Sequence, residues 1–415
     1  MNLTNFKVLF SAFTFFFVMF FRWEGLDPTL MGWANNGFIL AFLIVNRDIF
    51  KLARCPEYKW INLIALLWAL VVIYSAYQNH TTTFDLVIWD SYAQRFDITT
   101  RGAMGLSHSI YFVVKFLMFI LYFEYLSSNN GSKLFLKYLF PFLLIFVVLS
   151  DINGFIYESD GIGGYKAGNK FYICYLNIFL VTIYLLKKGI TEFSQRRKLL
   201  IKTLLIITFL LSMKTECTTM IIGTLFYYAM LFWYSKRHIY KLYKPVFFLI
   251  CLFCLDILFF ILIPAILELP FIQYIVVDIL GENLTLTGRL MIYEQIGTVL
   301  DDCPLYGFGL GNSNLTTLRY DVGPNAQNGL LNYFIELGLF GTFLFFGLLL
   351  LMIVRAKTYN ESYSVICFIY MMLLLSSVEI TFSTYFMSIA IMLLLHNAPS
   401  EKYEKDWNHY GTSLA

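Results

Sequence analysis

The chain has 415 residues, of which 59% are hydrophobic and only 14% are charged, and its mean hydropathy is +0.68. Soluble globular domains are about half apolar and about one quarter charged, so this composition excludes that class and predicts a polytopic membrane protein. The formal net charge of +3 says little about partners, and no nucleic-acid partner is expected. The seven cysteines are scattered through mostly apolar runs, so no disulfide framework is expected.

Long apolar segments follow one another along most of the chain. Because a helix needs about 20 apolar residues to cross the hydrocarbon of a membrane, we predict an all-α polytopic membrane protein with about 12 transmembrane helices. Residues 1–415 then form a single transmembrane domain, and the first segment is a retained span because no small-residue cleavage site follows it. Two breaks in longer apolar runs, at Lys214 and near Glu379, are needed to reach this number. The predicted spans are 7–21, 29–46, 59–77, 108–126, 134–150, 171–187, 199–213, 216–234, 245–265, 329–354, 363–379 and 382–397.

Lysine and arginine concentrate on alternate connections between these spans, the largest cluster lying at 187–202. Since basic residues favour the cytoplasmic side, this pattern predicts that both termini are cytoplasmic. Three long segments then face outward, namely 78–107, 151–170 and 266–328. Long loops between spans usually have a function, so the loop at 266–328 is expected to carry the working site.

The second half of this loop contains a predicted short amphipathic helix from Arg289 to Leu300. Its apolar residues stand at 292, 296, 299 and 300, which is helical spacing, and Thr285 or Thr287 can cap its first turn. This helix could lie on the outer membrane surface. Arg289 stands in the first turn and Tyr293 one turn later on the same face. Free N–H groups and a guanidinium suit a phosphate or diphosphate, whereas the alternative is an interfacial arginine that snorkels.

A glycine-rich stretch, Tyr306–Asn312, and a charged stretch follow the helix. The G-x-G-x-G pattern would need a preceding strand in a βαβ unit to bind a dinucleotide, so we interpret it as a tight turn that brings backbone close to a ligand or another helix. Arg319 is interpreted as either a phosphate clamp or the salt-bridge partner of Asp321. Asp321 is a candidate general base, although a close arginine would lower its pKa and weaken it in that role.

Three motifs in this region resemble a known family. They are Thr287-Gly-Arg289, the glycine turn Gly307–Gly311, and Ala326-Gln-Asn-x-x-Leu331-x4-Glu336-x-Gly338-x-x-Gly341. Together they resemble the signature region of the O-antigen ligase/polymerase superfamily, and the match covers residues 287–341. The histidine of the family pattern falls on Gln327, and glutamine cannot take up a proton at ordinary pH.

The resemblance implies an enzyme on the outer face of the bacterial cytoplasmic membrane. Such enzymes move a glycan from undecaprenyl diphosphate to a sugar hydroxyl, without a nucleotide cofactor or a required metal. Arg289 carries over as the diphosphate contact, and Gln327 and Asn328 carry over as acceptor contacts. The expected catalytic residues are Arg289, Gln327 and Asp321. The expected substrate-binding residues are Arg319, Tyr293, Asn328, Lys170 and Lys214.

The assignment of Lys170 and Lys214 as substrate-binding residues depends on weaker resemblances to the family. Lys166–Lys170 faintly resembles a family loop rich in glycine and asparagine. The alternative interpretation is an ordinary polar loop. Lys214 stands where relatives often have the arginine of S-x-S-R, and the alternative is an ion pair with Glu216.

The expected function is polymerisation of undecaprenyl-diphosphate-linked repeat units of O-antigen or capsule in lipopolysaccharide biosynthesis. The alternative within the family is an O-antigen ligase with lipid A-core as acceptor. A rival of another class is a lipid-linked oligosaccharide flippase or transporter, which would use the intramembrane charges Lys115 and Asp256. The expected partners are the lipid-linked oligosaccharide, membrane lipid and a chain-length regulator protein, and the expected location is the bacterial cell inner membrane.

Overall fold

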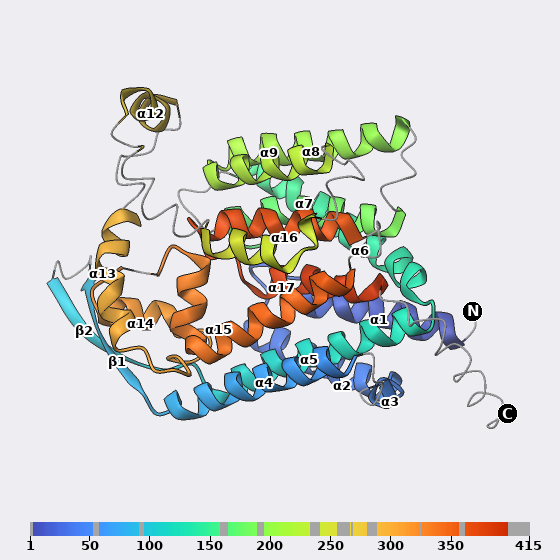
Figure 1. Cartoon of the computed structure of the whole chain (residues 1–415), viewed down its shortest axis with the longest axis horizontal. Coiled ribbons are helices and arrows are strands. Elements are labelled where there is room, and N and C mark those ends of the chain that lie inside the picture. Colours follow the sequence, from blue (N-terminus) through green and yellow to red (C-terminus); the bar gives the residue numbers. More distant parts are fainter. Residues whose placement is uncertain are drawn as a thin grey trace.

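A computed structural model of the chain describes residues 3–52, 58–90, 95–157, 165–188, 195–232, 241–254, 266, 269–279, 289–323, 325–356 and 362–396 (Figure 1). The protein is mostly helical, with a single pair of strands within these ranges. The described part of each predicted span is mainly helical, and both predicted breaks are helix boundaries. One lies after Lys214, and the other lies between Ser376 and Thr384.

The expectation of twelve membrane crossings is not reproduced, because only six of the described helices are both long enough and apolar enough to cross a membrane. Helix α1, for example, has 17 residues, and α16 has 14. The six are α2 (Pro28–Val45), α4 (Lys59–Asn79), α5 (Leu106–Ser128), α6 (Ser132–Ile156), α7 (Lys170–Lys188) and α15 (Gly329–Ala356). Other helices include α1 (Leu3–Met19), α3 (Ile49–Leu52), α8 (Gln195–Lys214), α9 (Thr218–Phe232), the helix Pro245–Cys254, α12 (Pro270–Gln273) with the π-helical turn Tyr274–Ile279, α16 (Tyr363–Ser376), and α17 (Thr384–Ala390) with its 3₁₀ continuation Ile391–His396.

Aromatic side chains fill the centre of the bundle. Phe15 of α1 is fully buried and packs edge-on against Phe119 and Phe123 of α5, with ring centroids 4.8 and 5.1 Å apart. Outer faces are also apolar: Trp33 and Ile44 of α2 are 73% and 66% exposed. Large exposed apolar faces are rare on soluble proteins, so this exterior suits a lipid environment.

The segment predicted as an outer loop at 78–107 contains an antiparallel hairpin, β1 (Thr83–Asp90) paired with β2 (Arg95–Gly102). The sequence did not predict this hairpin, which is a small addition to a mostly helical fold. Alternation along β1 explains the strand: Phe84 and Leu86 are buried, whereas Asp85 between them is exposed. The buried face packs against the short helix α14 (Ser313–Arg319).

The hairpin, α13 (Arg289–Asp301) and α14 lie together at one end of the bundle, opposite the start of α1 (Figure 1). The first half of α15 belongs to the same layer, because the helix is broken at Gly338, where φ is 64° and ψ is −168°. The span predicted at 329–354 is therefore two helices that meet at an angle. We call the hairpin together with residues 289–323 and 325–337, which include α13, α14 and the first part of α15, the end layer.

Candidate functional site

Helix α13 confirms the helix predicted from Arg289 to Leu300, but its environment differs from the prediction. Its apolar stripe does not face a membrane surface, because it packs on other parts of the end layer. The buried residues of this small second core are Ile292, Ile296, Val299, Val322, Ala326 and Ile335. The side chain of Arg289 lies outside the described residues, as do Thr285 and Thr287. The diphosphate contact therefore stays a prediction.

The glycine turn brings two backbones into contact. Gly307 and Gly338 both have positive φ, 77° and 64°. A Cβ atom on Gly307 would overlap the carbonyl group of Glu336, and one on Gly338 would overlap that of Leu305. The prediction of a tight turn against another helix is confirmed, and the close approach explains why both positions need glycine.

Backbone hydrogen bonds hold this contact on both sides of the break in α15. Phe308 N donates to Ile335 O at 2.8 Å, before the break. Phe340 N donates to Leu305 O at 3.2 Å, after it. The turn at 305–309 therefore spans the kink and holds its two halves at a set angle.

The turn before α15 brings three predicted site residues together. Tyr293 Oη lies 2.9 Å from the carbonyl oxygens of both Gln327 and Ser377, so its hydroxyl ties α13 to this turn and to the end of α16. Asn328 is fully buried, and its Oδ1 accepts a hydrogen bond from Leu331 N at 2.9 Å, which makes it the cap of α15. These contacts give Tyr293 and Asn328 structural roles whatever substrate they also meet.

Gln327 has a left-handed backbone with φ of 51°, and its N–H donates to Asn325 Oδ1 at 2.9 Å. Its side chain is half-buried. Arg319 and Asp321 are exposed, and Arg319 is the last residue of α14. Within the described part of the chain no ion pair joins these two, so the predicted salt bridge is not found there.

Cys303 lies in the same layer, where α13 ends. Its thiol is half-buried and lies 3.6 Å from the carbonyl oxygen of Phe334. Burial disfavours the thiolate and raises the pKa of Cys303 to about 12. This cysteine is therefore a structural thiol with little nucleophilic character.

Lys170 and Lys214 form a second group. Lys170 begins α7, and its Nζ donates to the carbonyl oxygen of Glu216 at 3.0 Å. Glu216 stands two residues after Lys214, in the turn between α8 and α9, and has a positive φ of 52°. The structure thus brings together the two loops to which these lysines belong.

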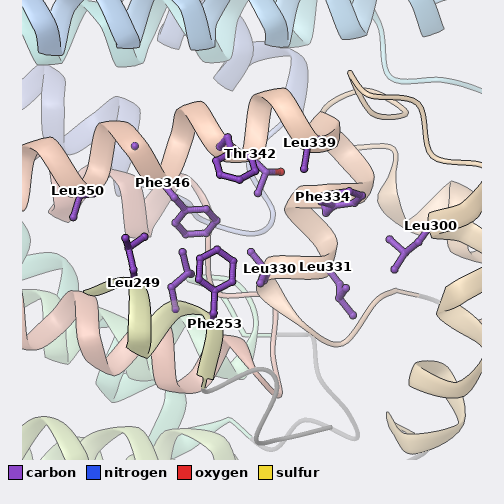
Figure 2. Close-up of a pocket in the computed structure, with 13 residues that line it drawn as sticks. Leu249, Phe253, Leu300, Leu330, Leu331, Phe334, Leu339, Thr342, Phe346 and Leu350 are labelled. Carbon is purple, nitrogen blue, oxygen red and sulfur yellow. The ribbon is translucent and has the colours of Figure 1, made fainter. Parts of the chain in front are cut away.

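An apolar groove lies between α13, α15 and the helix Pro245–Cys254. Its volume is about 430 Å³, and Figure 2 shows Phe253 and Phe346 lying across from each other within it. Thr342 is the one lining residue that has a polar side-chain atom. The other lining residues are Leu249, Leu252, Leu300, Leu330, Leu331, Phe334, Leu339, Phe343, Gly347 and Leu350. Such a groove accepts a hydrocarbon chain and offers almost nothing to a polar ligand.

A larger polar cavity of about 840 Å³ lies elsewhere, between the ends of α1, α2, α5 and α17. It brings together Arg22, His108 and Lys115 from segments far apart in the sequence. Of these three, only Lys115 stands out in the sequence, as a charge inside a predicted span. The signal for His108 was its position seven residues earlier, on the same helix face.

Comparisons with protein-family models and with curated proteins found no match to this chain. The structure therefore defines a mostly helical protein with membrane-length helices, an end layer, an apolar groove and a polar cavity. Function is inferred from these features and from the sequence motifs.

Proposed function

We propose that the protein is a polymerase of polysaccharide repeat units carried on undecaprenyl diphosphate. It is placed in the bacterial cytoplasmic membrane as a multi-pass protein, with both termini inside and the end layer outside. The observation that carries this proposal is the apolar groove, which borders the same helix α13 that begins with Arg289.

A lipid-diphosphate donor needs an apolar slot for its tail and positive charge for its headgroup. Leu300 lines the groove, and it stands eleven residues after Arg289, or about 16 Å along the helix. A polyprenyl chain is long enough to cover this distance. One helix would then contact the tail at its end and the diphosphate at its start, where free N–H groups add to the guanidinium.

The acceptor sugar is assigned to the turn with Gln327 and to Asp321. In the transfer, the acceptor hydroxyl oxygen attacks the anomeric carbon, the bond from that carbon to the diphosphate oxygen breaks, and the lipid diphosphate leaves with the electron pair. The hydroxyl proton must go to a base. Gln327 cannot accept it, so Asp321, an exposed carboxylate in the same layer, is the proposed base.

The ligase alternative uses the same donor chemistry and differs only in its acceptor. A flippase is a second candidate, because the buried Lys115 lines a polar cavity within the helical bundle. Ionisable groups inside membranes often mark transport paths. Its predicted partner Asp256 lies outside the described residues.

The test is complementation of a deletion strain with Arg289→Ala, with Arg289→Lys as the charge-retaining control and matched protein levels checked by immunoblot. Loss of a polymerase gives surface glycan with a single repeat unit. Loss of a ligase leaves polymer on the lipid carrier, and loss of a flippase leaves repeat units facing the cytoplasm. Full-length glycan from Arg289→Ala would overturn the proposed site.

A further inference from the structure

The polar cavity has the features of a binding site that the proposed function does not use. It is formed by the end of α1, the link between α1 and α2, the first turns of α2, and the starts of α5 and α17. Its polar lining residues include Arg22, Glu24, Asn35, His108, Lys115 and Tyr385. Polar side chains thus come from four separate segments.

Lys115 is the innermost charge of the cavity. It is only 7% exposed, and it stands seven residues beyond His108, or about 10 Å deeper along α5. Its Nζ lies 5.1 and 5.3 Å from the ring centroids of Tyr111 and Phe112. Among the described residues, no carboxylate lies within ion-pair distance of this Nζ. The aromatic rings stabilise the ammonium group in part, but they supply no counter-charge.

The mouth of the cavity carries further positive charge. Arg22 is exposed and lies beside the Tyr385 hydroxyl, and the Tyr385 ring stacks on Tyr172 with a centroid distance of 4.0 Å. The Nζ of Lys166 lies close to Gly25, on the cavity rim. The one carboxylate of the lining belongs to Glu24, which is exposed. The lining therefore holds two basic side chains, Arg22 and Lys115, and one carboxylate, Glu24, while the Lys166 ammonium lies beside the rim.

A hydrogen-bond acceptor completes the site. Oδ1 of Asn35 is buried and has no hydrogen-bond partner among the described residues. An unpartnered buried acceptor favours a ligand that brings a donor, such as a sugar hydroxyl. The volume of about 840 Å³ exceeds what a phosphate group alone would fill.

We propose that the polar cavity binds a phosphate-bearing anion, held by Lys115 at its floor and Arg22 at its mouth, with room for an attached sugar. The phosphate belongs either to a lipid headgroup or to a soluble phosphate. For a polymerase of lipid-linked repeat units, this phosphate is the diphosphate of the acceptor lipid, and this one assignment rests on the proposed function. A polymerase uses two lipid diphosphates, whereas a ligase uses one.

The test is binding of inorganic pyrophosphate and of farnesyl diphosphate to the purified full chain in nanodiscs, measured by calorimetry. Lys115→Met should weaken binding at this site about 30-fold or more, because a buried charge partner is lost. Arg22→Gln should weaken it about threefold to tenfold, because this cation is exposed to water. Lys137→Met, which removes an exposed lysine of α6, is the control and should leave affinity unchanged.

The two probes separate the sources of the phosphate. Binding of both indicates a site for a phosphate as such, and binding of farnesyl diphosphate alone indicates a lipid headgroup. Lys115→Arg, which keeps the charge, should restore binding and excludes a simple folding defect.

Repeating the titrations in Arg289→Ala separates this site from the donor site. Binding that Arg289→Ala leaves intact and Lys115→Met removes supports the cavity, whatever becomes of the proposed function. Unchanged binding in both Lys115→Met and Arg22→Gln, or no binding by the original protein, would overturn the inference. The proposed donor site at Arg289 would then still be tested separately by the glycan phenotype of the Arg289→Ala strain.

Discussion

The end layer and the polar cavity use their polar groups in opposite ways. In the end layer, the Tyr293 hydroxyl is bonded to backbone carbonyls of two neighbouring segments, and the Asn328 side chain caps the helix that follows it. In the cavity, Lys115 Nζ has no carboxylate partner and Asn35 Oδ1 has no hydrogen-bond partner among the described residues. Removing a polar group that stabilises the fold therefore has a different effect from removing one that is available to bind a ligand. Substitutions in the first region should lower stability, and those in the second should lower binding.

The largest effect is expected for Gly307→Ala. A Cβ atom would overlap the carbonyl group of Glu336 at a left-handed position, so the free energy of unfolding should fall by about 3 kcal/mol or the protein should fail to accumulate. The measurement is the thermal midpoint in detergent, and the control is Gly297→Ala, where a Cβ would have nothing within 4 Å. Equal midpoints for the two variants would contradict the described contact.

Tyr293→Phe should lower stability by about 1–2 kcal/mol, because it leaves carbonyl acceptors without their donor. The matched change is Tyr320→Phe, whose hydroxyl donates to Asp302 at an exposed site and should contribute less. Glycan polymerisation that falls only in proportion to folded protein would indicate a structural role for Tyr293. A loss of activity at full stability would place its hydroxyl on the substrate.

In contrast to the end-layer variants, Lys115→Met should raise the free energy of unfolding of the ligand-free protein by about 1 kcal/mol. The reason is that it removes a buried charge that has no counter-charge among the described residues, and it adds an apolar side chain of similar length. Thermal unfolding without pyrophosphate measures the stability of the ligand-free protein, and unfolding with pyrophosphate measures how much the ligand stabilises it. A large destabilisation without ligand would show that Lys115 has a structural partner.

Gln327→Gly should change stability by less than about 0.5 kcal/mol, because glycine adopts the left-handed backbone of this turn more easily than glutamine. It therefore removes the side chain without disturbing the cap beside it. Loss of polymer in a complemented strain would support an acceptor contact. Gln327→His, if it raised the rate, would indicate that a base had been lost here.

The last prediction concerns the chemical reactivity of the Cys303 thiol and not the stability of the protein. With its pKa raised to about 12, almost no thiolate forms near pH 8, and labelling by a maleimide should be slow. Asn314→Cys, at an exposed position of α14, is the reference thiol. Equal labelling of the two cysteines would contradict the burial of Cys303.

The sequence was informative wherever a local pattern decides the structure. The apolar spacing at Ile292, Ile296 and Val299 predicted α13, and the glycines predicted the turn that contacts α15. The break at Gly338 was missed, because a single glycine in a long apolar run reads as continuous helix. The alternation of Phe84 and Leu86 is a strand pattern that the prediction of helical spans did not include.

The polar cavity shows why the rest could not be predicted. Arg22 follows one helix, Lys115 lies within another, and Asn35 belongs to a third. No spacing along the chain relates these positions, so their meeting depends on how the helices pack. The side chain of Arg289 lies outside the described residues, so its proposed role rests on the sequence motif and on its position at the start of α13.

The bonds on both sides of Gly338 have a mechanical consequence. Because residues 305–309 bridge the two halves of α15, the angle between them cannot change without breaking backbone hydrogen bonds. The outer half of α15 must therefore move with the inner half as a rigid elbow. Any gating motion that admits a bulky substrate has to come from segments not braced by this turn.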